Sequence, residues 1–93
     1  MLEIIDLRTV RPLDYDAILK SVKKTNRLVI LEESCPFGNI STDITYKIQN
    51  EAFDYLDAHI IKLNTADTPA PYSPVLLEEW LPKSKDVVKA VEV

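Results

Sequence analysis

The chain has 93 residues, a net charge of −4, a hydrophobic content of 46% and one cysteine. These totals fit one small globular domain over residues 1–93 and exclude an internal disulfide. The negative charge argues against nucleic acid as a partner, and no apolar run approaches the ~18 residues that a membrane span requires.

Three short apolar runs, at residues 2–7, 28–31 and 60–63, predict strands. The second, "LVIL", is apolar at every position, which is typical of a parallel strand covered on both faces. Helical patterns separate the runs, so two consecutive right-handed crossovers are expected. The predicted fold class is α/β, with helices covering a mostly parallel sheet.

The first helical pattern begins after Asp14, a plausible N-cap, and ends near Asn26. In the second, apolar residues step by four from Ile40 to Leu56, and we expect Phe53 to widen this stripe. Either Asn39 or Ser41 can cap that helix.

After residue 63 the alternation of strand and helix patterns ends. The stretch "NTADTPAPYSP" has three prolines within six residues, which predicts an irregular connection. A short helix over 75–80 and a final one over 86–93 should follow it.

Sites for phosphate, nucleophilic and metal chemistry are not expected in this chain. The turn at residues 8–13 has no glycine to let a pyrophosphate approach the backbone, and Gly38 is the only glycine in the sequence. Cys35 follows the second strand and His59 precedes the third, so parallel strands would hold them on the order of 13 Å apart. One cysteine and one histidine leave no nitrogen and sulfur ligand set for a metal.

Carboxylates are plentiful and stand in pairs. Glu32 and Glu33 point to opposite faces of a strand, so at most one of them can serve a site. Asp54 and Asp57 share a helix face and can form a charged patch, although solvated surface groups are the commoner outcome.

Arg8, Arg11, Tyr72 and Trp80 are the candidates for a subunit or domain interface. The two arginines follow the first strand, where a planar guanidinium can pair with carboxylates or meet a neighbouring domain. No acid, base or nucleophile converges on them, which favours a structural role over substrate binding. The two aromatic residues suit either a ligand shelf or an interface.

Four stretches together carry a family resemblance: "IIDLRTVRPLD", "SVKKTNRLVILEES", "NEAFDYLDA" and "ADTPAPYSP". In this order and spacing they resemble the C-terminal domain of the beta subunit of pyruvate dehydrogenase, within the wider group of transketolase C-terminal-like domains. The resemblance covers essentially the whole chain. It implies a three-layer α/β/α fold, and we expect the chain to lack the family's N-terminal strands.

The sequence also departs from the family pattern. Ser34, Cys35 and Pro36 stand where the family usually has Gly-Trp-Pro, and His59 replaces a common proline. These changes leave the subunit assignment intact but do not identify the substrate that the enzyme prefers. A branched-chain 2-oxo-acid dehydrogenase, or another transketolase-like enzyme, therefore stays open as an alternative.

The resemblance implies a role in assembly and docking. In the family, thiamine diphosphate and Mg²⁺ bind between other domains, so we expect this chain to bind neither and to be inactive alone. The implied partners are the alpha subunit, a second beta subunit and the dihydrolipoyl acyltransferase core. Asp57 matches an aspartate that docks the acyltransferase's basic subunit-binding domain. The compartment would be the bacterial cytoplasm or the mitochondrial matrix. A free-standing small-molecule binding or regulatory domain is the alternative from another class.

Overall fold

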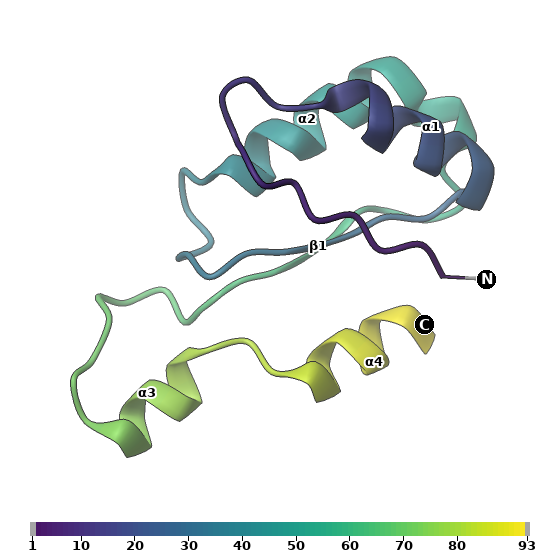
Figure 1. Ribbon diagram of the computed structural model, residues 1–93. Coiled ribbons are helices and arrows are strands. Elements are labelled where there is room, and N and C mark those ends of the chain that lie inside the picture. Colours follow the sequence, from purple (N-terminus) through teal and green to yellow (C-terminus); the bar gives the residue numbers. More distant parts are fainter. Residues whose placement is uncertain (1, 93) are drawn as a thin grey trace.

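The computed structural model describes residues 2–92 of the chain. Within them lie four α-helices, a short 3-10 helix and two strands (Figure 1). In chain order the elements are α1 (Tyr15–Thr25), β1 (Val29–Leu31), α2 (Ile40–Ala52), η1 (Phe53–Tyr55), β2 (Ile61–Leu63), α3 (Pro74–Trp80) and α4 (Ser84–Glu92).

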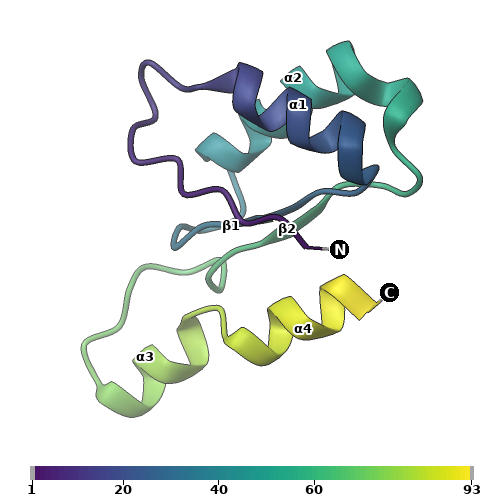
Figure 2. The ribbon, with the colours of Figure 1, turned by 45° about the vertical axis from the view of Figure 1, so that its right-hand side comes forward.

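The two strands form a parallel pair in the middle of the molecule. Val29 lies opposite Ile61 and Leu31 opposite Leu63. Helices α1 and α2 cover one face of this pair, and α4 runs along the other (Figures 1 and 2). This α/β/α layering confirms the predicted fold class, and α2 is the crossover that a parallel connection requires.

The predicted caps define α1. The Asp14 carboxylate accepts a hydrogen bond from the backbone N–H of Ala17 at 3.1 Å, which satisfies one of the free donors of the first turn. At the other end Asn26 takes a left-handed conformation, with φ 68°, and its N–H bonds to the carbonyl of Val22. Asn26 therefore ends the helix as a C-cap.

Helix α2 is shorter than the sequence predicted. Asn39 is its N-cap and accepts from the N–H of Thr42, but the α-helix ends at Ala52 and a 3-10 turn follows. Phe53 is 65% exposed, so the prediction that it widens the apolar stripe is wrong. At 3.6 residues per turn, Phe53 lies about 140° around the helix from Ile48, well off the buried face.

The core forms where α1 and α2 meet. Its fully buried apolar residues are Ile18, Val22, Ile44, Ile48 and Ala52. Side chains from β1, from the residues just before each strand and from the start of the chain pack against them, including Ile30, Leu28, Ile60 and Leu7. The spacing of three and four residues put these side chains on single helix faces, and burial of those faces joins the helices to the sheet.

Residues 2–7 are extended but do not form the predicted strand. Ile4 is 87% exposed. The Glu3 carboxylate instead accepts a hydrogen bond from the Ser21 hydroxyl at 2.8 Å and pairs with Lys24 at 2.6 Å, both on α1. Leu7 packs against the core. A strand needs a ladder with a neighbour, which the apolar pattern alone cannot supply.

The C-terminal third wraps around the opposite side of the sheet. The proline-rich connection leads to α3, which has Pro74 in its first turn. Trp80 donates its indole N–H to the carbonyl of Thr68 at 3.0 Å, and the N–H of Ala66 bonds to the carbonyl of Trp80. These two bonds fix the connection to the end of α3. Among the helices of residues 2–92, none is long and apolar enough to cross a membrane.

Candidate functional site

A polar network fills the carboxyl end of β1. The Glu32 carboxylate accepts a hydrogen bond from the backbone N–H of Ser41 at 3.1 Å, in the first turn of α2. The Asn39 side chain accepts from the Ser41 hydroxyl at 2.7 Å and from the N–H of Thr42. Asn64, just after β2, donates to the Ser41 hydroxyl at 3.4 Å. Both strand ends are thereby joined to the start of α2.

An open pocket of about 370 Å³ lies over this network. Its lining residues are Glu32, Ser34, Gly38, Asn39, Ile40, Thr42 and Asp43. A helix N-terminus attracts anions, but here the carboxylate of Glu32 already accepts from a first-turn N–H. Asp43 adds a second negative charge to the lining. The network therefore stabilises the fold, and its negative charges disfavour binding of an anionic ligand.

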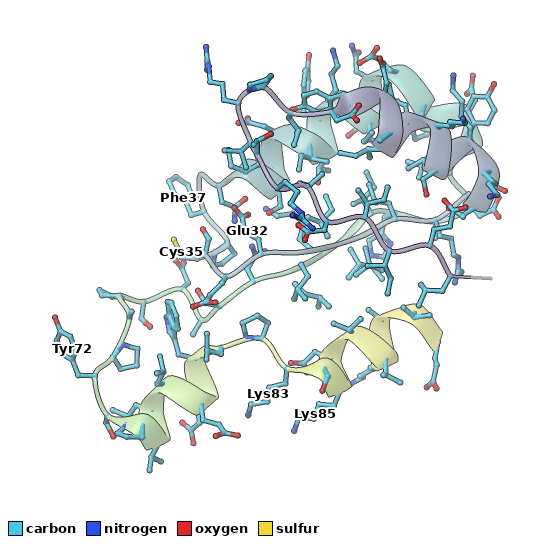
Figure 3. The ribbon with its side chains drawn as sticks, viewed as in Figure 1. Glu32, Cys35, Phe37, Tyr72, Lys83 and Lys85 are labelled. Carbon is cyan, nitrogen blue, oxygen red and sulfur yellow. The ribbon has the colours of Figure 1, made fainter. Side chains whose placement is uncertain are left out.

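Cys35 and His59 are not brought together. Cys35 follows β1, and His59 precedes β2. Because the strands are parallel, the two residues lie at opposite ends of the pair, as the sequence predicted. The thiol of Cys35 faces the carbonyl of Phe37 at 3.7 Å, and Figure 3 shows both side chains near the carboxyl end of β1. Residues 2–92 hold no group of three or more side chains suited to bind a metal ion.

The two candidate arginines lie in the loop before α1. Arg8 pairs with Asp6 at 3.4 Å, and its N–H bonds to the same carboxylate. Arg11 is exposed and lines a second open pocket together with Tyr15 and Asp43. The predicted pairing of arginine with a carboxylate is found for Arg8, within the same loop. Since residues 2–7 form no strand, neither arginine lies at a strand end.

Tyr72 and Trp80 have different surroundings. Tyr72 is 101% exposed and points away from the molecule (Figure 3). Trp80 is half-buried and holds the proline-rich connection through its bond to Thr68. The two rings therefore share no ligand shelf in this structure. Tyr72 is available to a partner surface, and Trp80 has a structural contact of its own.

Asp57 lies on the loop that follows η1, and its side chain is exposed. The loop is tied to the end of α1. The N–H of Asp57 donates to the carbonyl of Asn26 at 2.9 Å, and the Asn26 amide donates to the carbonyl of Tyr55 at 2.7 Å. The ammonium of Lys23 lies 5.3 Å from the centre of the Tyr55 ring, within the range of a cation–π contact.

Sequence reasoning missed the side-chain contacts of two residues. It identified Asn26 only as the end of a helix, and Glu32 only as one of an adjacent pair of carboxylates. The signal for Asn26 was its amide, which a left-handed C-cap does not need, since glycine serves that position. For Glu32 there was no local signal, because its partner Ser41 is nine residues away.

Residues 1–87 match the family described as Transketolase, C-terminal domain. The chain belongs to this family.

Three relatives are each named as the beta subunit of an enzyme. The chain is 49% identical over 90 residues to "Pyruvate dehydrogenase E1 component subunit beta" of Rickettsia felis, and 44% identical over 91 residues to the mitochondrial protein of that kind from Saccharomyces cerevisiae. Each match covers 97% of this chain, but only 28% and 25% of the relative. A third relative, "Acetoin:2,6-dichlorophenolindophenol oxidoreductase subunit beta" of Bacillus subtilis, is 44% identical over 86 residues, which cover 92% of this chain and 25% of the relative.

Proposed function

We propose that this chain, as one domain over residues 1–93, is the C-terminal assembly and docking domain of the beta subunit of a pyruvate dehydrogenase. The identity of 44–49% along nearly the whole chain carries this proposal. The chain spans about a quarter of the length of those relatives. The activity of the whole enzyme, oxidative decarboxylation of pyruvate with reductive acetylation of lipoyl groups, is therefore part of the proposal.

Thiamine diphosphate and Mg²⁺, which such an enzyme uses, do not fit the residues of this chain. The start of α2 is the obvious place for a diphosphate, but Glu32 and Asp43 give it negative charge. Gly38 is the only glycine, and no cluster of metal-ligating side chains occurs within residues 2–92. We propose that other parts of the enzyme bind the coenzyme.

Docking is assigned to Asp57. Its carboxylate is exposed, and Asp54 lies close by on η1. The proposed partner is the basic subunit-binding domain of the dihydrolipoyl acyltransferase core. Opposite charges across such an interface raise the association rate and fix the register of the two proteins.

Assembly is assigned to apolar surface elsewhere. The exposed large apolar side chains include Phe37, Tyr72, Val75 and Leu76. Large apolar side chains that stay exposed are candidates for contacts with other proteins. We propose that these residues, with Arg8, Arg11 and Trp80, meet the alpha subunit and a second beta subunit. The compartment would be the bacterial cytoplasm or the mitochondrial matrix, according to the source.

The experiment that tests docking compares two aspartates in the assembled dehydrogenase. Replacing the carboxylate in Asp57→Ala should weaken binding of the subunit-binding domain at least about tenfold, because a charged partner is then left unpaired. Asp54→Ala makes the same change of net charge on the neighbouring turn and should have a much smaller effect. Calorimetry at two salt concentrations should show weaker binding at the higher one. Unchanged affinity of Asp57→Ala would show that the docking assignment is wrong.

A second candidate enzyme is supported by the acetoin relative, which is as similar as the yeast protein. The domain would have the same place in that enzyme, with a different substrate. The two candidate functions are distinguished by measuring the turnover of pyruvate and of acetoin by the complete enzyme that contains this chain. Activity with acetoin alone would overturn the assignment to pyruvate.

A further inference from the structure

We propose that Asn26 is a positioning residue for the docking loop, which we define as residues 55–57. This inference rests on the proposed docking function of Asp57. Asn26, at the end of a helix distant in sequence, bonds to the backbone on both sides of Leu56 and so fixes the place of Asp57 on the surface.

Asn26, the residue that caps the end of α1, holds the docking loop at two points. The backbone carbonyl of Asn26 accepts from the N–H of Asp57 at 2.9 Å, and its side-chain amide donates to the carbonyl of Tyr55 at 2.7 Å. These bonds fall on either side of Leu56. The peptide groups that flank Leu56 are therefore fixed relative to the end of α1.

Neighbouring contacts support the same segment from both sides. Leu56 packs against the hydrophobic core, and Lys23 lies over the Tyr55 ring. Tyr55 and Asp57 are both exposed, and Asp57 is the charged residue of the loop. A charged side chain on an ordered loop loses less conformational entropy on binding than one on a mobile loop. We call the two hydrogen bonds of Asn26 to the docking loop the clamp. The clamp holds Asp57 in position before its partner binds.

The identity of residue 26 fits this role. Its φ of 68° is in the left-handed region, which glycine and asparagine adopt at low cost. Glycine would satisfy the helix end equally well but offers no donor to Tyr55. Aspartate has the same shape as asparagine, but its carboxylate would face the Tyr55 carbonyl as a second acceptor.

Two substitutions of Asn26 in the assembled dehydrogenase distinguish an effect of the clamp on binding from an effect of surface charge alone. With the acyltransferase's subunit-binding domain as the probe, Asn26→Gly should weaken binding about 2- to 10-fold, the worth of one hydrogen bond. Asn26→Asp should also weaken it. A purely electrostatic surface predicts the opposite sign for Asn26→Asp, because more negative charge would attract a basic partner more strongly. Asn50→Asp, which makes the same change of charge on the exposed side of α2, is the matched control and should not weaken binding.

A double-mutant cycle with Asp57→Ala completes the test. If Asn26 acts through Asp57, adding Asn26→Gly to Asp57→Ala should cause no further loss. An equal loss in both backgrounds would overturn the clamp, since a general structural effect is additive. If Asp57→Ala weakens binding while Asn26→Gly leaves it unchanged, the clamp is wrong and docking by Asp57 stands. If Asp57→Ala has no effect, the docking function fails, and the clamp with it.

Discussion

Glu32 should contribute measurably to the stability of this fold, although the sequence marks it only as a charged residue after a strand. Its carboxylate accepts from the N–H of Ser41, a residue that is only 1% exposed. In Glu32→Ala that N–H loses its partner in a place that water reaches poorly. A hydrogen bond to a charged acceptor contributes ~1.5–3 kcal/mol, and a negative charge at a helix N-terminus adds ~0.3–1 kcal/mol.

We therefore expect Glu32→Ala to lower the free energy of unfolding by about 2 kcal/mol. Glu32→Gln keeps an acceptor and loses only the charge, so its cost should be about 0.5–1 kcal/mol. Urea denaturation followed by circular dichroism measures both, provided the denaturant slopes agree. Glu33→Ala is the matched control, because Glu33 is exposed and should change stability by less than about 0.5 kcal/mol. Equal losses for Glu32→Ala and Glu33→Ala would refute the argument.

Two further predictions concern the core and the start of the chain. Ile48 is 0% exposed, so Ile48→Ala should lower the free energy of unfolding, measured by urea denaturation, by about 3–4 kcal/mol. The exposed Phe53 is the control, and Phe53→Ala should lower it by less than ~0.5 kcal/mol. Similar losses for the two variants would contradict the observed end of α2. The pKa of Glu3 is lowered from its ordinary value of 4.5, first by the hydrogen bond from Lys24 and then by that from Ser21. The contacts of Glu3 with Ser21 and Lys24 tether residues 2–7 to α1. Because the pKa of Glu3 is lowered in the folded chain, this tether contributes fully to stability above the ordinary pKa of 4.5. Its contribution is lost as the pH falls through the lowered pKa. The NMR signals of Ser21 should shift with pH as Glu3 is protonated, and this shift should be absent in Glu3→Gln. The same shift in Glu3→Gln would disprove the tether.

The sequence by itself determined the features that depend on near neighbours. Asp14 and Asn39 cap helices through bonds to residues three positions away, and the apolar spacing of α1 and α2 selected the buried faces. Alternation of strand and helix gave the parallel pair. These signals work because helix caps and helix faces depend on side chains within one turn of each other.

Only the tertiary structure decided which distant groups meet. The amide of Asn26 reaches the carbonyl of Tyr55 across 29 residues, and Glu3 pairs with α1 across 18 or more. The same packing left the apolar residues 2–7 without a ladder, although their pattern favours a strand. Such contacts depend on how the helices pack on the sheet, and a side-chain pattern cannot fix that packing. The two hydrogen bonds by which Asn26 holds the loop of Asp57 could therefore be found only from the folded chain.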